Sequence, residues 1–374
     1  MQSGDSPLRY GWTTGACATA AVKAACQALA TGHFPDPVTI RLPRGQEPAF
    51  ALAKHRLSEN EATVGIVKDA GDDPDVTHGA LVMATVRPLG PGEGIRFRAG
   101  KGVGTVTRAG LPMAVGEPAI NPVPRRMMRE VVAEVADSLG GPRDVEIEIA
   151  IADGEKLAER TLNPRLGILG GLSVLGTTGI VVPYSCSAWI HGIHRGVDVA
   201  RAAGLSHIAG ATGKTSEQAV LNHHGLPELA LIDMGDFVGG MLKYVRAHPV
   251  PRVTVAGGVA KMAKLAQGML DVHSNRGAVD LDALAGYAVA AGGTDALARH
   301  IRGSNTAAEA FGHAGVEGIA LGDAVARAAW DTAASVLDDP AIMLDIVLFD
   351  REGRLVGQTP PAPAHSPSRP RKRR

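Results

Sequence analysis

Hydrophobic and polar residues follow two different patterns along the chain, and the change of pattern suggests two domains. Residues 14–31 are rich in alanine between a threonine and Gly32, which predicts a helix, and residues 125–139 place apolar side chains on one helical face. Residues 145–151 (VEIEIAI) alternate strictly and predict a half-buried strand. Short β-like runs separated by Gly, Pro and Asp turns fill residues 37–106. Residues 1–155 are therefore expected to form an α+β domain with a mixed sheet.

The second half alternates short apolar runs with helical stretches. The runs are GLSVLG (171–176), SHIAGATG (206–213), LALIDMGD (229–236), RVTVAGG (252–258) and MLDIVLFD (343–350). Helical patterns follow the first four, at 186–203, 215–224, 237–247 and 259–268, and a helical block at 279–336 precedes the last. This alternation predicts an α/β domain at 156–358 with a mostly parallel sheet. The Pro-rich, basic segment 359–374 is expected to be a disordered tail.

Composition and charge narrow the function classes. Lys plus Arg and Asp plus Glu both number 38 in 374 residues, and aromatic residues make up 3%. General binding to nucleic acid or to a membrane surface is therefore not expected. The N-terminus has no signal-peptide pattern, and the uncharged segment 166–194 is broken by glycines and a proline, so it is interpreted as a buried strand and loop. Three cysteines without a CxxC pair fit a cytoplasmic protein.

Loops after the predicted parallel strands carry the candidate binding chemistry. In an open parallel sheet, ligands bind beyond the carboxyl ends of the strands. The loops 176–185, 211–217, 233–237 and 256–264 are rich in Gly, Thr, Ser and Asp. Glycines allow close approach of the backbone, and N–H groups at helix starts favour anions. A small-molecule site is expected at this edge.

Standard nucleotide, metal and nucleophile patterns fit poorly. The segment AGATGKT lacks the first glycine of a phosphate loop, because Ile208 stands there, and no dinucleotide fingerprint is present. His191, His194 and Asp198 share a helical face, but an amphipathic helix explains them more simply, and His223-His224 is interpreted as a solvated helix end. No metal site is expected. Cys17, Ser185 and Thr177 have no partner histidine fixed by spacing.

Two constellations in the first half have both a structural and a functional interpretation. The segment 68–79 places Asp69, Asp72, Asp73 and Asp75 in one turn. It is either a solvated Asp-Pro turn or an acidic loop that supplies a carboxylate near a reacting atom. Thr13 and Thr14 stand at a predicted helix start, where capping explains one of them and anion binding would explain the second.

Several stretches together resemble one family, the cobalt-precorrin-5B C1-methyltransferases (the CbiD proteins). The matching segments are GWTTGACATAAVKAA (11–25), KDAGDDPDVTHG (68–79), GKGVGTVTRAGL (100–111), AINPVPRRMM (119–128), GEKLAERTLNPRLGILGGLSVLGTTGIVVPYS (154–185), GATGKTSE (210–217), MGDFVGGML (234–242), AGGVAKMAKLAQG (256–268), HSNRG (273–277) and NTAAEA (305–310). The resemblance covers residues 8 to 312 in order.

The resemblance implies an enzyme that uses S-adenosylmethionine as co-substrate and methylates C1 of cobalt-precorrin-5B to give cobalt-precorrin-6A in anaerobic cobalamin (vitamin B12) biosynthesis. It implies a tetrapyrrole substrate and no enzyme-bound metal, since the cobalt belongs to the substrate. It leaves room for a homo-oligomer and for contacts with pathway neighbours. A non-catalytic corrinoid or tetrapyrrole carrier and an ATP-dependent enzyme that uses AGATGKT remain as alternatives.

If the chain has this function, the glycine-rich loops and the acidic turn are expected to bind the two substrates. The donor is expected at the carboxyl edge of the second sheet, against Gly176, Thr177, Thr178 and Gly179, with Asp233 or Asp236 on its ribose or amino group. The tetrapyrrole is expected between the domains, against Thr13, Thr14, the Asp72/Asp73 turn, Asn163 and Arg165. Lys214 and Lys261 are expected as partners for its carboxylates. Asp72 or Asp73 is the expected acid/base group.

Overall fold

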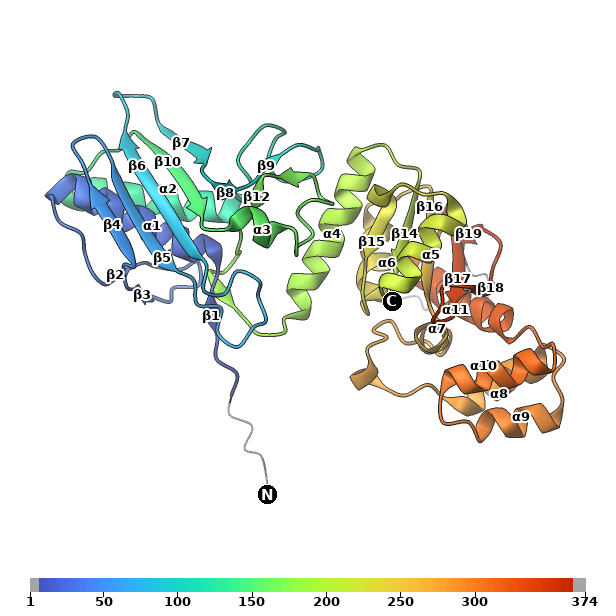
Figure 1. Cartoon of the computed structure of the whole chain (residues 1–374). Coiled ribbons are helices and arrows are strands. Elements are labelled where there is room, and N and C mark those ends of the chain that lie inside the picture. Colours follow the sequence, from blue (N-terminus) through green and yellow to red (C-terminus); the bar gives the residue numbers. More distant parts are fainter. Residues whose placement is uncertain (1–6, 366–374) are drawn as a thin grey trace, which may run out of the picture. The chain divides into compact units, whose positions relative to one another are not determined.

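The computed structural model describes residues 7–365, and the boundary between two compact units falls between Cys186 and Ser187 (Figure 1). The sequence pattern places this boundary at 155/156 instead. The difference arises because residues 156–186 belong to the first unit, where three short strands of this segment pair with strands nearer the N-terminus. The first unit is α+β and the second α/β, as predicted.

A five-stranded mixed sheet forms the centre of the first unit. Its strands, in spatial order, are β4 (Lys54–Leu57), β5 (Ala62–Val67), β6 (Leu81–Pro88), β10 (Val145–Ile151) and β7 (Ile95–Ala99). Neighbours are antiparallel except β10 and β7, which are parallel. The strict alternation of β10 matches its burial, because Val145 and its three isoleucines are buried and the residues between them are half-buried.

Two helices supply the other side of this core. Helix α1 (Thr14–Thr31) begins where the Thr13 side chain accepts a hydrogen bond from the Ala16 N–H and ends at Gly32, which has a positive φ. Its alanines are buried against α2 (Pro122–Leu139) and the sheet, since small side chains let the helices approach closely. Both predicted helices are confirmed, and α2 starts a few residues earlier than expected.

Short strand pairs complete the first unit. They are β1 (Gly11–Trp12) with β13 (Ile180–Val181), β2 (Val38–Thr39) with β3 (Ala49–Phe50), β8 (Gly102–Val103) with β12 (Gly171–Leu172), and β9 (Thr105–Val106) with β11 (Ile168–Leu169). The helix α3 (Gly154–Ala158) packs on β8 and β12.

One strand of the predicted parallel sheet therefore lies elsewhere. The run 171–176 was expected in the sheet of the second half, and that expectation is wrong, because β12 pairs with β8 in the first unit. A Cβ on Gly171 would lie 2.3 Å from the carbonyl carbon of Gly102. The two backbones approach this closely only because both residues are glycines. An apolar run shows that a strand is buried but not which strand it joins.

A six-stranded sheet forms the second unit. Parallel strands β15 (Leu231–Asp233), β14 (His207–Ala211), β16 (Arg252–Gly258) and β17 (Asp339–Phe349) lie in that order, and β18 (Leu355–Gln358) and β19 (Ala362–Ala364) pair antiparallel with β17. The sheet is mostly parallel, as predicted. Its strands β14 to β17 agree with four of the apolar runs.

Helices cover both faces of this sheet. Helix α5 (Lys214–His224) lies over one face, above a small cluster that includes Ala209, Ala256 and Val347. The other face packs against a larger core with α4 (Cys186–Ala202), α6 (Val238–Ala247), α7 (Val259–Ala266), α8 (Leu281–Ala290), α9 (Asp295–Arg302), α10 (Ala307–Val316) and α11 (Leu321–Leu337). Short 3-10 turns occupy Glu228–Ala230 (η1) and Ser274–Arg276 (η2).

Residues 359–365, expected at the start of a disordered tail, are ordered. The Thr359 N–H donates to Ile346 O at 3.0 Å, and the strand β19 then pairs with the edge of β17. Proline is compatible with this position because an edge strand has no neighbour on its outer side to receive an N–H. The rest of the predicted tail lies outside the described residues. Among residues 7–365, no helix combines the length and the apolar character that a bilayer crossing needs.

Candidate functional site

The start of helix α1 and the loop 175–179 form one compact feature of the first unit. The Thr13 N–H donates to Gly179 O at 3.0 Å, and the Gly15 N–H donates to Leu175 O at 3.0 Å. A Cβ on Gly176, whose φ is +131°, would lie 2.3 Å from Thr13 Oγ1. The sequence places these two segments apart, whereas the fold brings the predicted threonines and the predicted glycine loop into contact.

Each of the four aspartates in the acidic turn 69–75 forms a hydrogen bond or an ion pair that stabilises the turn. The Asp69 carboxylate pairs with the Arg9 guanidinium, which lowers the pKa of Asp69. The Asp72 and Asp73 carboxylates accept hydrogen bonds from backbone N–H groups of Arg9 (2.6 Å) and Tyr184 (2.8 Å). Asp75 pairs with a buried lysine, described below. These contacts give the turn a defined shape and keep Asp72 at the surface, where a ligand can reach it.

The buried Lys68 is the strongest structural feature of this turn. Its side chain is 1% exposed, and its ammonium forms an ion pair with Asp75 and donates to Thr77 Oγ1 at 2.7 Å. Burial opposes ionisation of Asp75, but the charge and hydrogen bond of Lys68 more than offset it and hold the pKa of Asp75 below its usual value.

Asn163 and Arg165 follow α3 on the same unit. Asn163 is buried, with its Nδ2 donating to Gly171 O at 3.4 Å and its Oδ1 accepting from Ser173 Oγ at 3.3 Å. It therefore supports the loop that leads to residues 176–179. The Arg165 carbonyl accepts a hydrogen bond from Arg108 Nη1 at 3.2 Å.

The carboxyl edge of the second sheet brings together part of the predicted donor site. Asp233 ends β15, and Lys214 starts α5. Lys261 on α7 lies 2.6 Å from Asp236 Oδ1, in an ion pair without good hydrogen-bond direction, and donates to Thr212 O at 2.9 Å. No side-chain cap occupies the N-termini of α5, α6 or α7 within this described edge. In the first turn of α6, the Gly239 N–H donates to Leu270 O at 2.8 Å.

The predicted site residues thus divide between the two units. Thr13, Thr14, Asp72, Asp73, Asn163, Arg165 and residues 176–179 belong to the first unit, and Lys214, Asp233, Asp236 and Lys261 belong to the second. The prediction that residues 176–179 follow a strand of the second sheet is wrong, because β12 lies in the first unit. The roles of all these residues in binding stay predictions.

The environment of Cys17 also disfavours it as a nucleophile. It lies fully buried in α1, and burial raises the pKa of its thiol to about 12. A thiol with that pKa is protonated at neutral pH and is a poor nucleophile.

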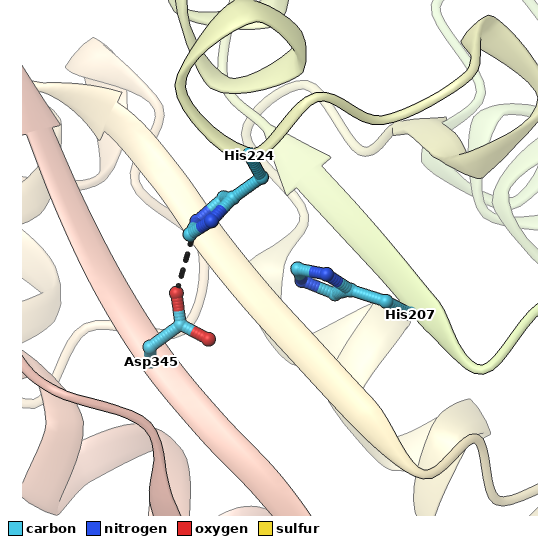
Figure 2. Close-up of side chains that lie close together, drawn as sticks. All are labelled: His207, His224 and Asp345. Atoms are coloured by element: carbon cyan, nitrogen blue, oxygen red, sulfur yellow. Dashed lines mark ion pairs between the residues drawn. The ribbon is translucent and has the colours of Figure 1, made fainter.

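A cluster of polar residues in the second unit escaped sequence analysis. His207 at the start of β14, His224 at the end of α5 and Asp345 within β17 point toward one another (Figure 2). The His224 Nε2 lies 3.2 Å from Asp345 Oδ2, and the donor atoms of all three side chains lie within 4.8 Å of one another. His224 was interpreted as part of a solvated helix end, which is wrong: its side chain is 13% exposed.

Two further residues complete this cluster. Thr254 Oγ1 lies 2.8 Å from His207 Nε2 and donates to Asp345 Oδ2 at 2.9 Å. Arg252 Nε donates to Asp345 Oδ1 at 3.0 Å. Burial opposes ionisation of Asp345, yet the hydrogen bonds from His224, Arg252 and Thr254 hold its pKa below the usual value. One feature of the sequence could have indicated this cluster. Each of the apolar strands β14, β16 and β17 carries one polar residue on its inner side: His207, Thr254 and Asp345.

The sequence suggested His191, His194 and Asp198 as a weak metal set, and two of these residues have other partners. His194 stacks on Tyr244 with ring centroids 3.9 Å apart, and Asp198 accepts a hydrogen bond from the Tyr244 hydroxyl at 2.7 Å and pairs with Arg195 at 3.0 Å. Among the described residues, these three positions do not form a group of converging ligand atoms.

We expect His207 to make stability depend on pH. Burial lowers the pKa of His207 to about 4, and the charge of Arg252 adds to this effect. Between about pH 6.5 and pH 4 the unfolded chain binds a proton that the folded chain does not, so the folded state loses stability as pH falls through this window. Above this pH window the His207 ring is neutral in both the folded and the unfolded chain, so it adds no pH dependence to the stability.

Urea unfolding between pH 7 and pH 4, with a chelator present, measures this dependence. The variant His207→Gln should lose less stability than the unmodified chain across the window. Asp345, with its lowered pKa, contributes only below that range, where its carboxylate becomes protonated. Equal slopes for variant and unmodified chain would contradict the environment described for His207.

Comparisons with known proteins point to one family. The CbiD family model matches residues 1–183, and the model of the CbiD C-terminal domain matches residues 271–360. A curated protein of Agrobacterium fabrum named cobalt-precorrin-5B C(1)-methyltransferase is 63% identical over 98% of this chain and 97% of its own length. The chain belongs to the CbiD family.

One further relative and one solved structure are also similar to this chain. The protein of the same name from Halorhodospira halophila is 62% identical over 96% of each chain. A crystal structure of the cobalamin biosynthesis protein CbiD from Archaeoglobus fulgidus is 26% identical, covers 74% of this chain and 86% of its own, and has a TM-score of 0.40.

Proposed function

We propose that this CbiD chain transfers the methyl group of S-adenosylmethionine to C1 of cobalt-precorrin-5B, giving cobalt-precorrin-6A in anaerobic cobalamin biosynthesis. The observation that carries the proposal is near full-length identity of 55% to 63% with relatives named for this reaction. The bond between C1 and the methyl carbon forms as the methyl–sulfur bond breaks, and the electron pair of the broken bond stays on sulfur in S-adenosylhomocysteine.

This reaction needs positioning more than a reactive enzyme group. A sulfonium donor is already activated, so holding its methyl carbon in line with C1 supplies much of the lowering of the barrier. The protein's task is therefore to bind a sulfonium nucleoside and a macrocycle with many carboxylates. Loops rich in glycine, threonine and cationic side chains suit that task.

For the donor, we propose contacts at the carboxyl edge of the second sheet. Asp233 and Asp236 are suited to the ribose hydroxyls or the amino group, and the uncapped helix starts offer N–H groups to the donor carboxylate. For the tetrapyrrole carboxylates we propose Arg165, with Asn163 holding its loop, and Thr13 and Thr14 at the start of α1.

Equilibrium binding tests the donor. Calorimetric titrations of the full chain with S-adenosylmethionine and S-adenosylhomocysteine should show saturable binding, while ATP and NAD should show none. Replacing Asp236 with asparagine should weaken binding of the donor about tenfold, because a hydrogen bond to a charged group is lost. Asp282→Asn is the matched control, since Asp282 pairs with Arg302 at an exposed site.

Other results of these titrations would favour a different function for the chain. Binding of ATP alone would favour an ATP-dependent enzyme that uses the segment AGATGKT. Binding of a corrinoid without any dependence on the sulfonium donor would favour a carrier. If no nucleotide binds, the titration is repeated with corrinoid present, which exposes a donor site that forms only after the tetrapyrrole binds.

A further inference from the structure

The cluster of the second unit points to a metal site that lies apart from the loops proposed for methyl transfer. We infer that His207, His224 and Asp345 bind a divalent transition-metal ion of the zinc type. The inference does not depend on the proposed function, because it rests only on the arrangement of these side chains within one unit.

The donor atoms already stand near the spacing that a tetrahedral site requires. Zinc bonds of about 2.0–2.1 Å to nitrogen and oxygen place neighbouring ligand atoms roughly 3.3 Å apart. His224 Nε2 and Asp345 Oδ2 are 3.2 Å apart, and Figure 2 shows the His207 ring directed toward the same space. A ring nitrogen of His207 lies within 4.8 Å of the other two ligand atoms, and metal binding through Nε2 would replace its present contact with Thr254 Oγ1 at 2.8 Å. Two imidazoles and one carboxylate form a common set of zinc ligands.

The fold holds these ligands from three separate elements. His207, Thr254 and Asp345 lie on the same face of neighbouring parallel strands, because Thr254 pairs with Asp345 in register and His207 lies at the start of the next strand. The end of α5 brings His224 over that face. A metal ion at this point would join β14, α5 and β17 at the amino ends of the strands, opposite the edge proposed for the donor.

The surrounding residues act as an outer shell. Arg252 Nε donates to Asp345 Oδ1, while Asp345 Oδ2 accepts a hydrogen bond from Thr254 Oγ1 and lies 3.2 Å from His224 Nε2. Outer partners of this kind orient metal-binding carboxylates and strengthen the site. Arg252, Asp323 and Asp345 line the cavity beside the cluster, and together they carry a charge of −1 when the histidines are neutral. This net negative charge favours a divalent cation.

An adjoining cavity leaves room for a water ligand. It has a volume of about 610 Å³ and is lined by His224, Arg252, Asp323, Asp345 and residues 355–361. Three protein ligands with a fourth position open to water is the arrangement of exchangeable zinc sites, in contrast to closed structural sites. A metal ion would bind each imidazole in its neutral form, through one ring nitrogen.

Cobalt(II) is the probe that tests this site, since it takes zinc positions and gives a strong visible absorption in tetrahedral coordination. The full chain, freed of metal by a chelator, is titrated with Co²⁺ while absorbance and melting temperature are recorded. We expect one Co²⁺ per chain, tetrahedral absorption and a higher melting temperature, because the ion binds the folded state. Zn²⁺ should displace Co²⁺ and abolish the absorption.

Single variants identify the ligands. His207→Gln and His224→Gln should each weaken Co²⁺ binding by more than about a hundredfold, since removal of outer partners alone costs 10–100-fold. His223→Gln is the matched control, because His223 is the neighbouring histidine and instead contacts Gln358 Oε1 at 3.0 Å. Its affinity should stay within about twofold of the unmodified chain's. Circular dichroism checks that each variant is folded.

Two results would overturn the inference. The first is absence of tetrahedral absorption at one equivalent of Co²⁺ in the unmodified chain. The second is binding that persists unchanged in both His207→Gln and His224→Gln, which would assign the ion to other histidines. Neither result bears on donor binding, so the proposed function is tested separately.

Discussion

Replacing Asp75 with asparagine is expected to lower the free energy of unfolding by about 3 kcal/mol or more, because it leaves a buried charge without its partner. Lys68 is 1% exposed and has Asp75 as its anionic partner. Thr77 Oγ1 remains as a hydrogen-bond acceptor for the ammonium but carries no charge. The asparagine is nearly isosteric and can still accept from the Thr77 N–H, so the loss reports mainly on the charge.

Urea unfolding monitored by circular dichroism measures this effect. Asp137→Asn is the control, because Asp137 pairs with Arg143 where both side chains are about two-thirds exposed, and such pairs contribute about 0–1 kcal/mol. The double variant Lys68→Met/Asp75→Asn should recover part of the stability, since an apolar side chain then replaces the unpaired charge. Equal loss in the Asp75 and Asp137 variants would contradict the account of this turn.

The second large effect concerns catalysis at the same turn. Substituting asparagine separately for Asp72 and for Asp73 is expected to lower kcat by about 10²-fold or more in one of the two variants, if the turn supplies the acid/base group. Asparagine keeps an oxygen for the N–H groups of Arg9 and Tyr184, so the shape of the turn is retained while proton transfer is lost. An alanine at either position removes the acceptor oxygen as well as the group that transfers a proton.

The measurement is steady-state methyl transfer with kcat and KM determined separately over a range of pH. A proton-transfer role predicts a fall in kcat together with a changed pH profile in the asparagine variant. A purely structural role predicts that both asparagine variants keep full kcat and that only the alanine variants lose stability and turnover. Full turnover in a folded Asp72→Ala/Asp73→Ala double variant would remove both residues from the mechanism.

Local patterns predicted the elements well, because each is determined by residues that are adjacent in sequence. The alanine run of α1, with a threonine before it and a glycine after it, specifies a helix and its ends. The alternation of VEIEIAI specifies β10. The strand β12 was assigned to the wrong sheet, since its pairing with β8 depends on a close approach of distant glycines that no local pattern contains.

The candidate sites show the same limit. Sequence analysis identified the segments around Thr13, the acidic turn and the glycine loop as chemically unusual, and the fold brings Thr13 and the loop 176–179 into contact. It did not detect the cluster around Asp345, because His207, His224 and Asp345 lie on three elements as much as 138 positions apart. Their convergence follows from strand order and register. Parallel-sheet register is set by long-range packing, which one sequence does not display.

Anaerobic incubation of the full chain with cobalt-precorrin-5B and S-adenosylmethionine labelled in its methyl group tests the central claim most directly. Mass spectrometry of the corrinoid should show the addition of one labelled methyl group at C1, with an equal amount of S-adenosylhomocysteine formed. A corrinoid that binds tightly yet stays unmethylated, with no S-adenosylhomocysteine produced, would contradict the account and identify the chain as a carrier.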